Sequence, residues 1–158
     1  MNTHKRKEKQ TMSDFLREWG LDEGTVKRGR KGLRYCSLPI KGIAWWWCSK
    51  FVREADKELG CISCGKRVKL QAGHFIPADR CGNELLMSRD NVNGECEFCN
   101  AWSSSHLLHY ERGLDRRYGA GTAQKLKDRF FNQKLTVYRR EDWAQIAREY
   151  RELYKAEL

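Results

Sequence analysis

The sequence has no long hydrophobic run and few prolines. Its most apolar stretch, residues 43–48, is ended by Ser49 and Lys50, far short of the roughly 20 apolar residues of a membrane span. Two prolines and 40% hydrophobic residues exclude a proline-rich or collagen-like chain, and 11% aromatic residues argue against full disorder. The basic first ten residues are followed by no apolar segment, so we find no secretory signal and expect a cytoplasmic protein with no membrane partner.

Acidic residues are the minority among the charged ones. The chain carries 31 Lys plus Arg against 21 Asp plus Glu, a formal net charge of +10. A positive field attracts polyanions, and nucleic acid is the commonest large polyanion in a cytoplasm. A basic protein that merely stays in solution is the plainer alternative, but the basic residues cluster, in residues 5–9 and 27–34 for example, which favours nucleic-acid binding.

The 158 residues suit one domain with an appended arm. Residues 1–38 read as a basic, partly flexible N-terminal arm, with a short helix over 13–19 and glycines and basic residues over 22–38. Residues 39–158 form the main domain. After Pro39, apolar residues recur every four positions and predict a helix. They are Ile43, Trp47, Phe51, Ala55 and Leu59.

The middle of the main domain is rich in Gly, Cys and Asn and predicts a hairpin with loops over residues 60–100, in which Val68, Leu70 and Ala72 alternate. Three further helices are predicted: from Cys99 or Asn100 to Tyr118, from 122 to about 133, and over 139–156. The inward face of the last one comprises Trp143, Ile146, Ala147, Tyr150 and Leu153. The expected fold class is therefore α+β, mainly helical.

Four of the seven cysteines stand at metal-ligand spacing. Cys61 and Cys64 form one C-x-x-C pair, and Cys96 and Cys99 form a second. Two such pairs predict a tetrahedral four-thiolate Zn²⁺ site, which is structural because it leaves no open position for a substrate. Metal binding contributes on the order of 10 kcal/mol to folding. The remaining cysteines lack partners at this spacing and read as small apolar residues. They are Cys36, Cys48 and Cys81.

A histidine lies between the two cysteine pairs, followed by asparagines and further histidines. The order is His74, Asn91, Asn100, His106 and His109. It resembles the HNH branch of the ββα-metal, or His-Me finger, nucleases, in which a hairpin and a helix grip one divalent ion. That resemblance implies an HNH-type core stabilised by zinc and flanked by helices. It assigns His74 as the general base, Asn91 as the residue that holds the His-bearing loop and Asn100 as an oxygen ligand to Mg²⁺ or Mn²⁺.

A closer resemblance covers residues 46–150. The order of four motifs resembles that in the lambdoid phage NinG (Rap) recombination nucleases. These motifs are C-I-S-C-G, A-G-H-F, N-V-N-G-E-C-E-F-C-N and I-A-R-E-Y. This resemblance implies a metal-dependent, structure-specific DNA endonuclease that acts on branched intermediates such as Holliday junctions and D-loops. A phage-encoded enzyme of this kind would work in the bacterial host cytoplasm. Two cuts per junction would suit a homodimer.

One departure from the HNH pattern concerns the catalytic ion. Many HNH enzymes carry an acidic ligand just before the base, where this chain has Gly73. His106 is the first candidate for the missing ligand, followed by His109 on the same helix face, and Asp79 and Asp90 are others. The residues expected to contact phosphates on either side of the cut are Lys66, Arg67, Lys69, Arg112, Arg116 and Arg117.

Two other functions remain open from the sequence. A nicking or homing-type HNH endonuclease would read a base sequence, and a zinc-knuckle DNA-binding protein would keep the cysteines and the charge without catalysis. Trp45 and Trp46 cannot both join the apolar stripe of their helix. Packing is the plainer role for them, and base stacking is the alternative.

Overall fold

The computed structural model describes residues 11–28, 34–36 and 38–158. The expectations for the basic cluster at 5–9 and for the middle of the basic run, residues 29–33, lie outside these ranges. Within these ranges the chain combines helices with two antiparallel pairs of strands, so the α+β class is confirmed. No helix in the described ranges has the length and apolar character needed to cross a membrane.

The N-terminal segment folds against the rest of the chain. Helix α1 (Met12–Trp19) is capped by Thr11, and its last turn ends at Gly20 with φ of 60°. After a short 3-10 turn (Glu23–Thr25), strand β1 (Val26–Arg28) pairs with β2 (Arg34–Cys36). The indole of Trp47 donates to the carbonyl of Trp19 at 2.9 Å. Part of the expected arm thus packs on the core, while the domain boundary at residue 38 stays a prediction.

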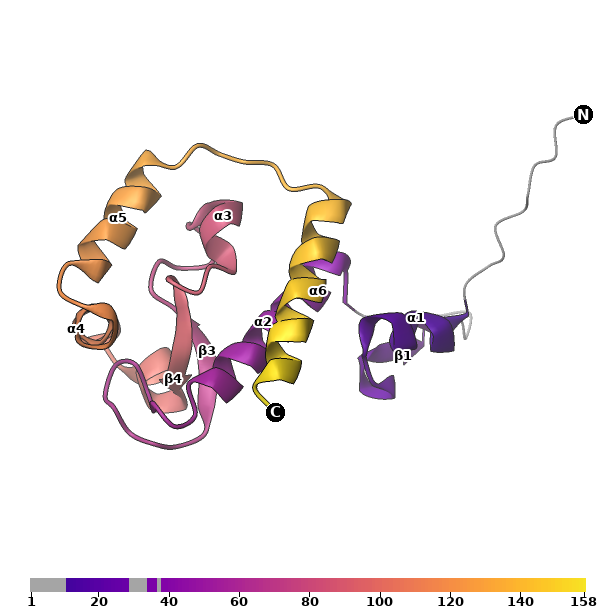
Figure 1. Ribbon diagram of the computed structural model, residues 1–158, viewed down its shortest axis with the longest axis horizontal. Helices are drawn as coiled ribbons and strands as arrows, with labels where there is room; N and C mark the ends of the chain where they lie inside the picture. The colour runs from indigo at the N-terminus through magenta and orange to yellow at the C-terminus, as the bar shows by residue number, and fades with distance from the viewer. Residues whose placement is uncertain (1–10, 29–33, 37) are drawn as a thin grey trace, which may run out of the picture.

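Two long helices form the main packing unit. Helix α2 (Ile40–Ala55) lies against α6 (Arg140–Ala156), with the rings of Phe51 and Tyr150 centred 5.6 Å apart (Figure 1). The apolar stripe was predicted one turn too long, because α2 ends at Ala55 and the chain turns at Gly60, leaving Leu59 56% exposed. Leu153, predicted to face inward, is also 47% exposed, because the inward face of α6 continues through Tyr154, whose ring packs on Trp47.

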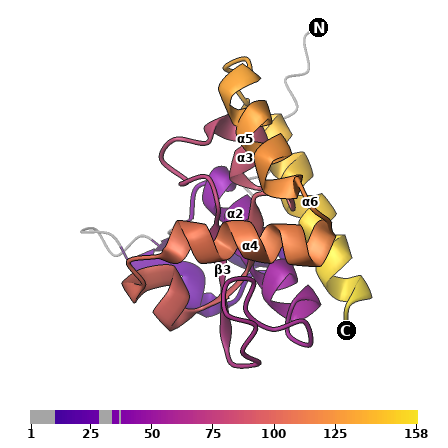
Figure 2. The same cartoon turned by 90° about the vertical axis from the view of Figure 1, so that its left-hand side faces the viewer.

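A β-hairpin lies between α2 on one side and α4 on the other (Figures 1 and 2). Strand β3 (Leu70–His74) pairs antiparallel with β4 (Val92–Cys96), so that Gln71 faces Glu95 and Gly73 faces Asn93. The connection contains the short helix α3 (Gly82–Leu86). Val68 was expected inside the hairpin but precedes β3 and is 52% exposed.

The helix predicted from Cys99 or Asn100 to Tyr118 is divided in two. A single π-helical turn (Phe98–Trp102) follows β4, and α4 (His106–Tyr118) begins only after the serines at 103–105. Serine favours helix ends and turns over helix interiors, so three consecutive serines favour a break there. Helix α5 (Thr122–Asn132) then leads to α6. Asn100 therefore lies on the π-helical turn and His106 at the start of α4.

Candidate functional site

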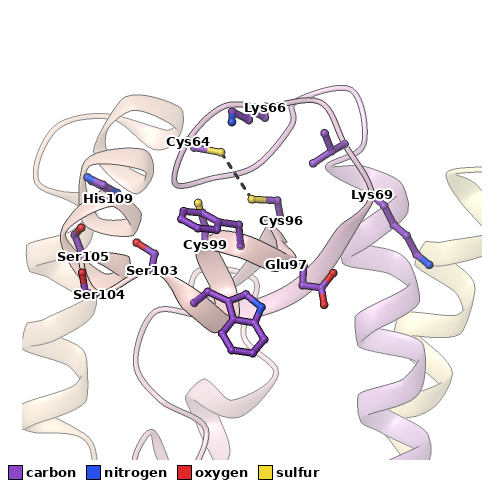
Figure 3. A pocket seen from close by; sticks show the side chains of 13 residues that line it. Cys64, Lys66, Lys69, Cys96, Glu97, Cys99, Ser103, Ser104, Ser105 and His109 are labelled. Carbon is purple, nitrogen blue, oxygen red and sulfur yellow. Dashed lines mark hydrogen bonds between the residues drawn. The ribbon is translucent and has the colours of Figure 1, made fainter.

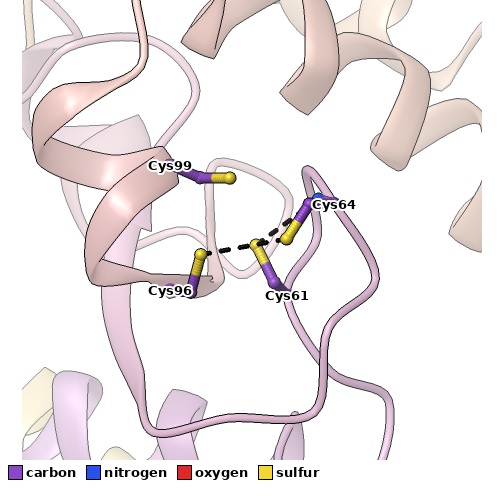
Figure 4. Close-up of side chains that lie close together, drawn as sticks. All are labelled: Cys61, Cys64, Cys96 and Cys99. Carbon is purple, nitrogen blue, oxygen red and sulfur yellow. Dashed lines mark hydrogen bonds between the residues drawn. The ribbon is translucent and has the colours of Figure 1, made fainter.

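The four cysteines predicted to bind zinc come together at one end of the hairpin (Figure 4). Their sulfur atoms all lie within 4.8 Å of one another, and Sγ of Cys64 is 3.8 Å from Sγ of Cys96. A tetrahedron with Zn–S bonds of about 2.3 Å has edges of about 3.8 Å. Burial raises the pKa of Cys61 and Cys99, so a bound cation is needed to keep them as thiolates near neutral pH. The cluster fits one metal ion such as zinc.

Helix α4 packs closely against the backbone around the first cysteine pair. A Cβ at Gly113 would lie only 1.9 Å from the carbonyl oxygen of Ile62, so no larger residue fits there. Arg116 donates to that same carbonyl at 2.9 Å, and Arg117 donates to the carbonyl of Gly60 at 2.8 Å. The guanidinium groups of Arg116 and Arg117, predicted to contact phosphates, are thus used within the fold. Charge alone had not revealed carbonyl acceptors more than 50 residues away.

His74 lies at the end of β3 and is held from two directions. Its Nε2 is 2.8 Å from the carbonyl oxygen of Leu86, and its ring stacks on Trp45 with centroids 4.8 Å apart. Because a carbonyl only accepts hydrogen bonds, Nε2 carries the proton and Nδ1 keeps a free lone pair. Burial lowers the pKa of His74, so the ring is neutral at pH 7. This tautomer is the one that a general base requires.

Asn91 fixes the loop that follows His74. Its side chain is fully buried, accepts from the N–H of Ile76 at 2.6 Å and donates to the carbonyls of Ile76 and Leu85 at 3.0 and 3.1 Å. The carbonyl of Leu85 is next to that of Leu86, which holds His74. Asn91 therefore positions the backbone that holds the ring of His74.

Gly73 occupies a position where two side-chain oxygens converge. A Cβ there would lie 2.7 Å from Oε2 of Glu95 and 3.0 Å from Oδ1 of Asn100. The amide nitrogen of Asn100 donates to Gln71 at 2.7 Å, which turns Oδ1 the other way. A carboxylate thus reaches across from β4 to the position that precedes His74.

Glu95 and His106 face each other without a hydrogen bond. Both Oε2 of Glu95 and Nε2 of His106 are buried and lack a hydrogen-bond partner among the described residues, and they are 3.5 Å apart. Two ligands of one divalent ion, each at about 2.1 Å, lie roughly 3 to 3.5 Å apart. Burial raises the pKa of Glu95 to about 7, and burial lowers that of His106. We name Glu95, Asn100 and His106 the carboxylate cluster; its donors fit a divalent cation.

The carboxylate cluster and His74 lie on opposite faces of the hairpin. Successive residues of a strand point to opposite faces, and Gly73 and His74 are consecutive with Cα atoms about 3.8 Å apart. The hydroxyl of Tyr110 on α4 donates to the carbonyl of Gly73 at 2.9 Å, which fixes this part of the strand. The two sets of groups are therefore adjacent around the end of β3.

His109, Lys66 and Lys69 line a different hollow. A cavity of about 670 Å³ beside the cysteines is bordered by these three side chains and by the exposed rings of Phe98 and Trp102 (Figure 3). His109 thus borders the cysteine side of the hairpin end, whereas its neighbour His106 faces Glu95. Lys66, Arg67, Lys69 and Arg112 are exposed, as phosphate contacts require.

The other candidate ion ligands are placed elsewhere. Asp90 forms an ion pair with Arg129 at 2.5 Å, and Asp79 is exposed in the loop before α3. Glu95 was missed because a single glutamate in a strand is usually a solvent-facing residue. The available signal was its place in V-N-G-E-C on a strand that leads into a metal-binding cysteine.

The fold and the site define a small α+β protein in which the turn before the hairpin, the end of β4 and the following π-helical turn bring together four cysteines that could hold a metal ion. The family model for the bacteriophage lambda NinG protein matches residues 43–157, so the chain belongs to the NinG family. Protein ninG of Escherichia phage lambda is 29% identical over 131 residues, which cover 78% of this chain and 62% of that protein. The ninG protein of Salmonella phage P22 is 29% identical, with 78% and 63% covered.

This chain spans about three-fifths of the length of these relatives. Protein ninG of Escherichia phage 933W is also 29% identical, over 66% of this chain and 56% of its own. No solved structure matches the chain significantly. Membership of this phage family confirms the resemblance to NinG proteins that the sequence motifs indicated.

Proposed function

We propose that this protein is a metal-dependent, structure-specific DNA endonuclease with an HNH-type core, which hydrolyses phosphodiester bonds in branched recombination intermediates such as Holliday junctions and D-loops. One observation carries the proposal: two buried polar atoms, on Glu95 and His106, face each other at 3.5 Å without a hydrogen bond. They lie beside the residue that precedes a neutral, oriented histidine. A purely structural core has no use for this arrangement, because unpaired buried polar atoms are costly.

His74 is the proposed general base. Its Nδ1 takes a proton from a water molecule while the water oxygen forms a new bond to phosphorus and the bond to the leaving sugar oxygen breaks. The carbonyl of Leu86 stabilises the resulting imidazolium by accepting from Nε2. Asn91 keeps that carbonyl in place through the loop it holds.

The carboxylate cluster is the proposed holder of the catalytic Mg²⁺ or Mn²⁺. A bound cation of this kind supplies charge that stabilises the phosphoryl and leaving oxygens. Carboxylate and amide oxygens suit hard cations, and the imidazole of His106 favours Mn²⁺ somewhat over Mg²⁺. The four-cysteine site is proposed to hold structural Zn²⁺.

The proposed DNA contacts are to phosphates. Four exposed basic side chains flank the hairpin end and suit contacts to phosphates rather than to base edges. They are Lys66, Arg67, Lys69 and Arg112. A surface of this kind recognises the shape of a branch rather than its sequence. A homodimer is proposed to make the two cuts.

The test uses a labelled four-way junction and a linear duplex of matched sequence, each with Mg²⁺, with Mn²⁺ or without an added divalent ion. We expect metal-dependent cuts in the junction, and His74→Ala should lower the rate by roughly two to four orders of magnitude with binding retained. Asp79→Ala, on the exposed loop after β3, is the matched control and should cleave normally.

Other outcomes would select the alternatives. Equal cleavage of junction and duplex at a fixed sequence would favour a nicking or homing-type HNH endonuclease. Tight binding without cleavage under any ion would favour a zinc-containing DNA-binding protein. Loss of binding in His74→Ala would make His74 a structural residue.

A further inference from the structure

A second pocket opens on the α2 side of His74. Its volume is about 530 Å³, within the range of small-molecule sites. The walls are almost entirely apolar, and the polar members are His74 and Lys41. The apolar lining comprises Pro39, Gly42, Trp45, Ala78, Leu86 and Met87. We name it the Trp45 pocket.

Flat aromatic surface dominates this pocket. Trp45 is half-buried, and its indole is held nearly parallel to the imidazole of His74, with 22° between the planes. The neighbouring Trp46 has a different environment, because it packs edge-on against Trp47 and under the ammonium of Lys50 at 3.9 Å. Only Trp45 therefore combines a packed ring with an opening beside the proposed base.

The rim of the Trp45 pocket is positive. Lys41 is exposed and lies within 5.0 Å of the Trp143 ring centroid. The pocket also lies at the N-terminal end of the 16-residue helix α2, whose N-cap is Pro39. Proline has no side-chain acceptor for the first N–H groups of a helix, and helix N-termini favour phosphates. The apolar wall with its aromatic ring suits the base of one nucleotide, and Lys41 at the rim suits its phosphate.

We propose that the Trp45 pocket receives one unstacked nucleobase of the DNA strand that is cleaved beside His74, with its phosphate at Lys41. The inference rests on the proposed function and names how its substrate is recognised. Branch points contain bases that are more easily unstacked than those of a continuous duplex, and insertion of such a base would be a shape criterion. Stacking tolerates every base, which suits recognition without sequence preference.

The test couples the protein side chain to the base. Binding of the full chain to a four-way junction is measured with Ca²⁺ in place of Mg²⁺, with each nucleotide that borders the crossover replaced in turn by an abasic residue. Trp45→Ala should weaken binding of the intact junction by roughly 5- to 100-fold, as expected for one lost stack. At one abasic position, wild type and Trp45→Ala should bind equally, and Trp45→Phe should restore most of the affinity.

The controls separate the possible failures. Trp102→Ala removes an exposed ring on the cysteine side and should show no coupling to any abasic position. If Trp45→Ala weakens intact and abasic junctions equally at every position, the pocket holds no base and Trp45 only supports His74. Metal-dependent cleavage would then leave the proposed function standing, whereas absence of junction binding by wild type would overturn both.

Discussion

Two buried carboxylates lie beside the same strand and have opposite surroundings. Asp56, at the end of α2, accepts from the N–H of Gly94 on β4, bonds to Arg89 and lies 3.2 Å from Arg117. Glu95, the next residue along β4, is bonded to Ser63 through one oxygen, while its second oxygen has no hydrogen-bond partner among the described residues. Both side chains are fully buried.

The difference separates a carboxylate that is paired within the fold from one that we propose binds a cation. A buried charge is tolerated when paired groups surround it, as at Asp56. Glu95 lacks an arginine or lysine partner among the described residues: Ser63 bonds one oxygen, and the imidazole of His106 lies 3.5 Å from the other. Burial raises the pKa of Glu95 to about 7. A buried carboxylate oxygen without a hydrogen-bond partner is costly for folding. Costs of this kind are typical of functional sites.

Removal of a zinc ligand should have the largest effect, because β4 ends in Cys96. That strand contains Glu95 and also Gly94, which donates to Asp56. Cys61→Ser should lose an interaction on the order of 10 kcal/mol and prevent stable folding. Far-ultraviolet circular dichroism and bound-zinc content measure this. Cys36→Ser, a cysteine outside the cluster, is the control and should fold with its zinc. A folded, active Cys61→Ser protein would contradict the zinc assignment.

Asp56→Asn tests the paired side of the comparison. Breaking a buried ion pair leaves Arg89 and Arg117 uncompensated and should cost about 3–5 kcal/mol, a fall in Tm of roughly 6–20 °C. Thermal unfolding measures it. Asp90→Asn, which removes the exposed pair with Arg129, should cost at most about 1 kcal/mol. An equal fall in Tm in Asp56→Asn and Asp90→Asn would show that the buried pairs of Asp56 stabilise the fold no more than an exposed pair does.

Glu95→Gln is the same chemical change on the unpaired side. It removes a buried negative charge that lacks a cation, so without added divalent ions Tm should be no lower than that of wild type. Added Mn²⁺ should raise the Tm of wild type but not of the variant. Cleavage should fall at least roughly a hundredfold. A Tm loss as large as that of Asp56→Asn would make Glu95 structural.

His74 and His106 sharpen the comparison through pH, because burial lowers the pKa of both. A lowered pKa keeps a histidine neutral down to pH values below its usual 6.5, so proton acceptance by His74 is lost only in more acidic solution. Cleavage should therefore be insensitive to protonation of His74 near pH 7 and fall on the acid side below pH 6.5. Single-turnover rates from pH 5 to 8 measure this at a divalent-ion concentration high enough to keep Glu95 ionised, because burial raises the pKa of Glu95 to about 7. A loss centred above pH 7 would argue against a neutral base.

Short-range patterns were the predictable part of this molecule. Cysteine pairs separated by two residues and the spacing of apolar residues are local features, so they predicted the four-cysteine cluster, the main helices and the α+β class. The same periodicity continued past real helix ends, as at Leu59, because an apolar side chain does not itself mark where a helix stops. The serines at 103–105 divided a helix that periodicity alone had joined.

Long-range geometry was the part that sequence reasoning missed. The role of Glu95 depends on its reach across the hairpin to Gly73 and on α4 covering it with His106. Likewise, Arg116 and Arg112 look alike in sequence, and only the carbonyl of Ile62 distinguishes them. Such pairings are set by tertiary contacts between residues tens of positions apart, which no local pattern encodes.

The smallest expected effect concerns two arginines of α4. Arg112 is exposed, whereas Arg117 is 13% exposed and holds Asp56 and the carbonyl of Gly60. Arg112→Ala should weaken junction binding severalfold and reduce the salt-dependence slope by about 1, with Tm unchanged. Arg117→Ala should instead lower Tm, because it leaves Asp56 with one guanidinium fewer. A Tm loss in Arg112→Ala would show that Arg112 supports the fold. A change in salt slope with Tm intact in Arg117→Ala would show that Arg117 contacts DNA. Binding isotherms at several salt concentrations, with thermal unfolding of the same samples, distinguish an arginine that neutralises DNA from one that neutralises the fold.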